Sequence, residues 1–232
     1  MNAADVMTTR VITVFPETGV REVARILHTN RISAVPVVDA EDRILGMLSE
    51  GDLLRRVKSG PDKGGSWWLS QLADEHAQPG GPGALRGVTA RDVMTREVFR
   101  VREDTPLEEV ATLLEHHRIK RVPVERDGKI VGIVSRANLI HGLATRRDGA
   151  MPVAGDAGIR AAILDALQQA AVSTHLLNVI VSDGTAYLWG GVDSDSEHQA
   201  VRAAAETVPG VKRVSDHLCV LAERLRPGLS EG

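Results

Sequence analysis

The chain has 232 residues, a formal net charge of −3 and an aromatic content of 3%. This length allows one or two domains with sizeable cores, while the acidic balance and the scarcity of aromatic rings for base stacking argue against a nucleic-acid-binding protein. No apolar run approaches the length needed to cross a bilayer, and the first residues lack the basic start and apolar core of a signal peptide. The single cysteine, Cys219, excludes an internal disulfide and fits a reducing compartment. We therefore expect a cytoplasmic protein.

The first elements alternate short apolar strands with amphipathic helices. Residues 11–14 are mostly β-branched, are followed closely by a proline, and predict a strand. Residues 18–28 place most of their apolar side chains on one helical face. Two further strands are predicted at 35–38 and 44–48, joined by a polar turn, and a second helix at 49–57.

This pattern occurs twice. The tetrapeptide Asp-Val-Met-Thr at 5–8 recurs at 92–95, an offset of 87 residues, and the segment 46–52 has a counterpart at 132–138. A repeat of this length indicates two similar folding units. One β-α-β-β-α unit of this size is marginal for independent stability, so we expect the two to pack on each other. In the second copy, Thr-Pro-Leu-Glu at 105–108 predicts a helix start with a threonine N-cap and a reciprocal glutamate.

An insertion without a counterpart separates the copies. Two glycine-rich loops, at 60–65 and 78–83, flank Trp67 and Trp68, which could belong to one short amphipathic helix. Two adjacent tryptophans cannot both face one side of a helix. Either both pack on the repeats, which is the simpler interpretation, or one of them faces a partner chain.

A third domain follows a linker rich in alanine, glycine and charged residues. Its helix places Ile159, Ile163, Leu164 and Leu167 on one face, and the Asp-Gly pair at 183–184 predicts a hairpin between strands at 178–182 and 185–190. Ser194 and Glu197 predict a capping box, followed by a helix to 205 and a last strand at 211–221. The fold class is α+β. The expected boundaries are repeat one at 1–60, the insertion at 61–87, repeat two at 88–143, the linker at 144–157, the α-β-β-α-β domain at 158–222 and a tail at 223–232.

Each repeat ends with a serine followed three residues later by an acid or an amide: Ser49 with Asp52, and Ser135 with Asn138. At a helix start, free backbone N–H groups and the positive end of the helix dipole suit a phosphate group. A carboxylate can in addition accept both hydroxyl protons of a ribose diol. The same spacing also predicts a capping box that needs no ligand, so the motif alone leaves both interpretations open.

The two repeats differ just before their Val-Pro pairs. The first copy has Ser33 and Ala34 there, and the second has Lys120 and Arg121. If the copies pack about a pseudo-twofold axis, these segments face the crevice between them, and the two cations suit a phosphate chain. Solvated charges at a strand edge are the alternative interpretation.

In combination, these motifs closely resemble the tandem CBS domain pair, or Bateman module, over roughly residues 1–143 apart from the insertion. The resemblance implies a non-enzymatic regulatory module that often forms dimers. It implies no permanent cofactor, but regulatory binding of AMP, ADP, ATP or S-adenosylmethionine, with or without magnesium, in the cleft between the copies. The residues that it assigns to the two sites are Ile12, Ile32, Ser33, Ala34, Ser49 and Asp52, and Phe99, Ile119, Lys120, Arg121, Ser135 and Asn138.

Asn138 departs from the usual acid of the family. Its amide offers one acceptor oxygen where a carboxylate offers two, so the grip on a ribose diol should weaken. The loss of a negative charge near phosphates partly offsets this. We expect the two sites to differ, with Asp52 and Arg121 belonging to separate binding events.

The third domain resembles the BON domain in its Asp-Gly hairpin, in Tyr-Leu-Trp-Gly at 187–190 and in Pro-Gly-Val at 209–211. That family is associated with phospholipid or with envelope partners. Residues 158–222 contain four basic and seven acidic residues, a formal charge of −3, which would repel anionic lipid head groups. We therefore favour a protein-contact or output role for this domain.

Other function classes fit the sequence less well. No His-x-x-x-His, Cys-x-x-Cys, phosphate-binding loop or Gly-x-Ser-x-Gly motif occurs. His116 and His117 are expected at the surface or at a helix cap, and Cys219 is expected to be a small buried hydrophobic residue. The sequence thus indicates a sensor of adenosine ligands that signals to an unknown protein target or to the BON-like domain. A scaffold with empty clefts, or an envelope-associated protein, is the alternative.

Overall fold

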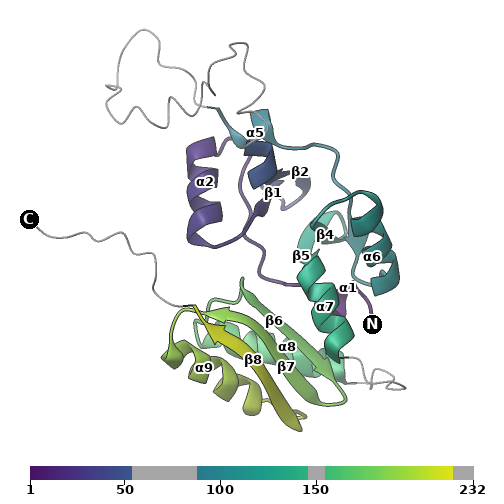
Figure 1. Ribbon diagram of the computed structural model, residues 1–232, viewed down its shortest axis with the longest axis vertical. Coiled ribbons are helices and arrows are strands. Elements are labelled where there is room, and N and C mark those ends of the chain that lie inside the picture. Colours follow the sequence, from purple (N-terminus) through teal and green to yellow (C-terminus); the bar gives the residue numbers. More distant parts are fainter. Residues whose placement is uncertain (54–87, 146–154, 222–232) are drawn as a thin grey trace, which may run out of the picture. The chain divides into compact units, whose positions relative to one another are not determined.

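The computed structural model describes residues 1–53, 88–145 and 155–221 (Figure 1). The chain divides into two compact units. One comprises Met1–Arg10, Val101–Val124 and Gly132–Gly232, and the other comprises Val11–Arg100 and Glu125–Val131. The mixture of helices and sheets confirms the α+β class. The insertion with Trp67 and Trp68, the later part of the helix expected at 49–57 and the tail from 223 lie outside the described residues.

The first repeat forms a small sheet covered by a helix. Strands β1 (Ala34–Val38) and β2 (Ile44–Ser49) pair antiparallel, and α2 (Val20–Thr29) precedes them. The strand expected at 11–14 is reduced to one parallel bridge between Val14 and Val37. The apolar face of α2 packs with the sheet and with α5 (Ala90–Val93) in one core cluster.

The second repeat has the same order of elements. It comprises β3 (Val101–Arg102), α6 (Leu107–His116), β4 (Arg121–Arg126), β5 (Lys129–Ser135) and α7 (Arg136–Thr145), with strand order β3-β4-β5. The second repeat therefore contains the full β-α-β-β-α unit, whereas in the first repeat the first strand is a single bridge and the second helix is described only as far as residue 53.

The predicted capping box at 105–108 is wrong. Helix α6 has Pro106 as its N-cap, without a side-chain cap, because the hydroxyl of Thr105 instead accepts a hydrogen bond from the backbone N–H of Arg102 at 2.9 Å. As expected, His116 and His117 lie exposed at the end of this helix.

The two Asp-Val-Met-Thr segments form short capped helices that each contact the other repeat. Met7, which follows α1 (Ala3–Val6), lies where a side chain on Gly132 of β5 would collide with it. Met94, which follows α5, lies in the same way against Gly46 of β2. The glycine of each repeat motif therefore makes room for the methionine of the opposite copy.

The third domain confirms the predicted order α-β-β-α-β. Helix α8 (Asp156–Gln169) and α9 (Asp195–Glu206) pack on a sheet with strand order β6-β7-β8, formed by Leu177–Ser182, Thr185–Val192 and Arg213–Val220. The Asp-Gly turn has positive φ at both residues, as a tight hairpin requires. Since α7 extends to Thr145 and α8 begins at Asp156, fewer residues separate the helices than the expected linker at 144–157.

Two details of this domain differ from expectation. Ser194 caps α9 by accepting from the N–H of Glu197, but the Glu197 carboxylate accepts from Asp193 at 2.7 Å rather than from Ser194. Cys219 is exposed, not buried, because β8 is the edge strand of the sheet and Cys219 lies near its end. No helix of the described part is long and apolar enough to span a membrane.

Candidate functional site

In the first repeat, Ser49 and Asp52 form a reciprocal cap at a helix that begins at Glu50. One carboxylate oxygen of Asp52 accepts from the backbone N–H of Ser49 at 2.9 Å and from its hydroxyl at 2.5 Å. The other oxygen accepts from the hydroxyl of Thr95 at 3.2 Å. Asp52 is only 9% exposed. A ribose that binds this carboxylate would therefore have to share or replace these donors.

The second repeat builds the same cap with an amide. The Oδ1 of Asn138 accepts from the N–H of Ser135 at 2.8 Å and from its hydroxyl at 2.6 Å. Its Nδ2 donates to the carbonyl of Val6 at 3.0 Å, a bond that a carboxylate could not make. The amide at this position is thus part of the contact with the segment that contains α1.

The segments before the Val-Pro pairs lie beside these caps. Ala34 pairs with Ser49 across β1 and β2, and the carbonyl of Ser33 accepts from Glu50 at 3.1 Å. In the second repeat, the carbonyl of Lys120 accepts from Arg136 at 3.2 Å. The candidate residues are therefore brought together within each repeat.

The remaining candidate residues are assigned only to one or the other compact unit. Ile12 and Ile32 are half-buried in the same compact unit as Ser49 and Asp52. Ile119 and Arg121 share the other unit with Ser135 and Asn138, but Phe99 does not belong to that unit.

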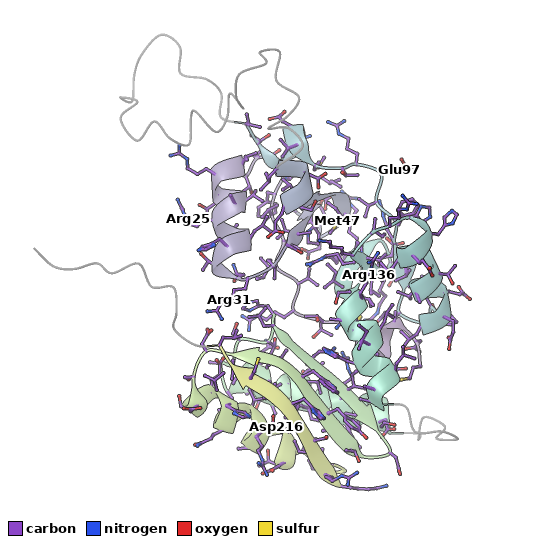
Figure 2. The ribbon with its side chains drawn as sticks, viewed as in Figure 1. Arg25, Arg31, Met47, Glu97, Arg136 and Asp216 are labelled. Atoms are coloured by element: carbon purple, nitrogen blue, oxygen red, sulfur yellow. The ribbon has the colours of Figure 1, made fainter. Side chains whose placement is uncertain are left out.

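The two caps differ in charge at one further position. The residue after the serine is Glu50 in the first repeat and Arg136 in the second, and both are exposed (Figure 2 labels Arg136 on α7). Together with exposed Lys120, Arg136 makes the start of α7 cationic. Sequence reasoning missed Arg136, although alignment of the two repeat motifs shows the charge reversal directly.

Family models match all three domains at these positions. The model for the CBS domain matches residues 3–59 and 90–145, and the model for the BON domain matches residues 155–222. The uncharacterized protein MJ1426 of Methanocaldococcus jannaschii is 30% identical over 144 residues, which cover 57% of this chain and 85% of that protein. The chain belongs to the CBS-domain family. It has a tandem CBS pair followed by a BON domain.

Other relatives match through the CBS pair. The CBS domain-containing protein CBSX1, chloroplastic, of Arabidopsis thaliana is 33% identical over 145 residues, which cover 58% of this chain and 60% of that protein. An inosine-5′-monophosphate dehydrogenase of Methanocaldococcus jannaschii is 29% identical over 139 residues, but only 23% of the enzyme is covered. That match does not extend the dehydrogenase activity to this chain. The solved structure of protein MJ1225 from the same organism matches with a TM-score of 0.50 and 22% identity, over 61% of this chain and 47% of that chain. This likeness shows the fold alone.

The BON domain contributes buried polar groups beside the second CBS cap. Arg160 of α8 is 8% exposed, and its guanidinium donates to the carbonyls of Val179 at 2.8 Å and Met7 at 2.6 Å. Burial lowers the pKa of Arg160 to about 10, so the group remains charged at neutral pH. Asn178 of β6 is 5% exposed and donates to the carbonyl of Val6 at 2.6 Å. Sequence reasoning missed both, because a polar residue within an apolar pattern does not reveal its partner.

Three stacked rings lie in the same region. The indole of Trp189 stacks on the imidazole of His141 at a centroid distance of 4.6 Å and on that of His217 at 3.9 Å. The Nδ1 of His141 donates to the Oδ1 of Asn178 at 3.1 Å. Desolvation is the main cause that lowers the pKa of His141; the hydrogen bond to Asn178 opposes it, and the charge of His217 adds to the lowering. The neutral imidazole is therefore the form that this arrangement favours.

Within residues 1–53, 88–145 and 155–221, no group of three or more His, Cys, Asp or Glu side chains is arranged so that it could hold a metal ion.

Proposed function

We propose that this protein is a regulatory sensor that binds an adenosine-type ligand at the serine caps of its CBS repeats. The supporting observation is that each repeat places a serine, followed by an acid or an amide, at the start of a helix and beside a Val-Pro segment. Such a site offers helix N–H groups to a phosphate and side-chain acceptors to a sugar hydroxyl. The repeats would contribute a ligand site each, as the CBS family resemblance implies.

Charge makes the second cap the better phosphate site. Lys120 and Arg136 are exposed at the start of α7, and Arg121 is half-buried beside them. The first cap has Ser33, Ala34 and Glu50 at the corresponding positions. Because an arginine can bind two phosphate oxygens at once and a lysine adds a point charge, we expect the second cap to prefer ligands with more phosphate groups. ATP should therefore bind there more tightly than adenosine.

Thermal unfolding against a ligand panel tests this proposal. The panel comprises adenosine, AMP, ADP, ATP with and without Mg²⁺, S-adenosylmethionine and a GTP control. A ligand present at a hundred times its dissociation constant stabilises the folded protein by about 2.7 kcal/mol, which thermal melts detect readily. We expect stabilisation by adenosine compounds and not by GTP.

Variants at corresponding positions of the two repeats then show which cap binds ATP. Lys120→Ala with Arg136→Ala should weaken ATP binding in calorimetry, whereas Ser33→Ala with Glu50→Ala, at the corresponding positions of the first repeat, should leave that event intact. A flat response to every nucleotide at millimolar concentration would instead support a scaffold whose caps are purely structural, and would refute the sensor.

We further propose that the protein forms a homodimer through the CBS pair. Ile140 and Leu143 on α7 are 64% and 65% exposed and lie three residues apart on one helix, which is unusual for aliphatic side chains without a partner. Light scattering should show a dimer, and Ile140→Glu with Leu143→Glu should shift it to a monomer. A wild-type protein that is monomeric at high micromolar concentration would contradict this.

The BON domain would then act as the output of the sensor, by contact with a protein. Its acidic balance disfavours anionic membranes. Flotation with vesicles of anionic phospholipid should leave the protein unbound, and recovery in the lipid fraction at physiological salt would favour membrane association instead.

A further inference from the structure

Both faces of strand β6 of the BON sheet are covered within the first compact unit. Val179 and Val181 of β6 belong to the core formed with α8 and α9. Because side chains alternate along a strand, Asn178 and Ile180 point to the opposite face. Ile180 is nevertheless fully buried, and α1 and α7 both contact β6. The BON sheet is therefore docked, through β6, on α7 of the second CBS repeat and on α1, the segment of the first repeat that packs against the second.

The polar centre of this contact is the end of α1. A helix of four residues leaves its last carbonyl groups without partners inside the helix. The carbonyl of Val6 receives Asn138 from the CBS repeat and Asn178 from the BON domain, and the carbonyl of Met7 receives Arg160. One backbone oxygen is thus shared by an amide from each domain.

Asn138 has a second set of bonds that connects this contact to the serine cap. Its Oδ1 is held by Ser135 while its Nδ2 is held by Val6, and the side chain is 5% exposed. A ligand that replaces Asn138 as the partner of the Ser135 hydroxyl, or takes Oδ1 of Asn138 as its own acceptor, would shift this amide. That change would remove or weaken one of the two donors at the Val6 carbonyl.

We propose that α1 and Asn138 couple the second CBS cap to the docking of the BON domain, so that a ligand at this cap loosens the docked sheet. The ligand-dependent part rests on the proposed function, whereas the coupling between Asn138 and Asn178 does not. A ligand shifts such an equilibrium only by its differential affinity for the two states. A loosened BON sheet would, by the same linkage, bind the ligand more tightly.

A double-variant cycle on the full chain tests the coupling without any ligand. Amide hydrogen exchange reports on α1, where the N–H groups of Ala3, Ala4 and Met7 are hydrogen-bonded. Asn138→Ala and Asn178→Ala should each accelerate exchange in this segment. Their joint effect should differ from the product of the single effects by at least about threefold, since residues that share one partner are not additive.

The matched control is Asp52→Ala, at the corresponding position of the first repeat. Its effect should combine with that of Asn178→Ala as a simple product, because Asp52 bonds to Ser49 and Thr95 in the other compact unit. If the accelerations of exchange caused by Asn138→Ala and Asn178→Ala also combine as a simple product to within twofold, the coupling is refuted.

The ligand arm uses ATP, with its binding measured separately by calorimetry. Trp189 can serve as a second probe in a Trp67→Phe, Trp68→Phe protein, since these are the only three tryptophans. Bound ATP should accelerate exchange in α1 and shift the Trp189 emission to longer wavelength. Bound ATP with α1 exchange unchanged or slowed would refute the loosening of the docked sheet by ligand and leave the sensor intact. Absence of ATP binding would refute the nucleotide proposal, and the double-variant cycle would still decide the coupling.

Discussion

Replacement of Asn138 by aspartate should destabilise the docked domain in a manner that depends on pH. The substitution changes the Nδ2 donor, which lies 3.0 Å from the carbonyl of Val6, into an oxygen. The lost hydrogen bond costs about 1 kcal/mol, and repulsion between two buried oxygens adds to it. The start of α7 favours a negative charge by roughly 0.3–1 kcal/mol, which offsets part of the loss. We expect a net destabilisation of about 1–2 kcal/mol at pH 7.5.

Acid should reverse this loss. A carboxyl group buried against a carbonyl is favoured in its protonated form, so the folded-state pKa of the new aspartate is raised above its unfolded value of about 3.9. Stability from such a group is present below the unfolded pKa and is lost as pH rises through the folded pKa. The protonated acid can also donate to Val6 again. The deficit relative to the parent protein should therefore shrink between pH 7.5 and pH 5.

Urea unfolding followed by Trp189 emission measures this deficit in the Trp67→Phe, Trp68→Phe background. Asp52→Asn is the matched control, because the hydroxyl of Thr95 can accept from the new amide as well as donate. Equal stability of Asn138→Asp and its parent at pH 7.5 would show that the bond to Val6 is not important for docking. A deficit independent of pH would show that the new oxygen does not lie against the carbonyl.

Three further outcomes follow from the same contacts. Burial lowers the pKa of His141 below 6.5, so the unfolded state binds more protons than the folded state. Thermal stability should therefore fall as pH drops from 6.5 toward the lowered pKa, and His141→Gln should flatten this decline. Gly132→Ala should cost about 1 kcal/mol in urea unfolding by crowding Met7, and Met7→Ala, but not Met94→Ala, should relieve this crowding. Gly190→Ala should cost at least about 3 kcal/mol in thermal or urea unfolding, since φ is +123° and the new Cβ would meet a backbone carbonyl.

Local patterns in the sequence predicted the elements and their order well. The period of apolar residues located α2, and the Asp-Gly pair located the turn of the β6–β7 hairpin. The caps at Ser49 and Ser135 were predicted as one of two interpretations, and the structure contains them. What these caps bind stays a prediction, because a capping box and a ligand site use the same atoms.

Contacts between distant segments could not be predicted in this way. The Asp-Val-Met-Thr motif marked the start of each repeat, but nothing local shows that Met7 contacts Gly132. Nothing in the sequence around Arg160 shows that its guanidinium binds the carbonyls of Val179 and Met7, which lie far away in the chain. The burial expected for Cys219 was wrong for a related reason, since strand order, and hence the identity of the edge strand, is a property of the whole sheet.

The placement of the two short helices also affects the order in which the chain can fold. The first repeat needs Met94 against Gly46, so that repeat is complete only after the segment that contains Met94, beyond the insertion, has been synthesised. The segment that contains α1 is hydrogen-bonded to residues far along the sequence, including Thr105, Arg160 and Asn178. Contacts of such long sequence separation slow folding. The α1 segment can pair with Thr105 and Ile133 once the second CBS repeat has been synthesised, but the carbonyls of Val6 and Met7 gain Asn178 and Arg160 only after the BON domain follows, so a change within this segment would also weaken the docking of a domain far along the sequence.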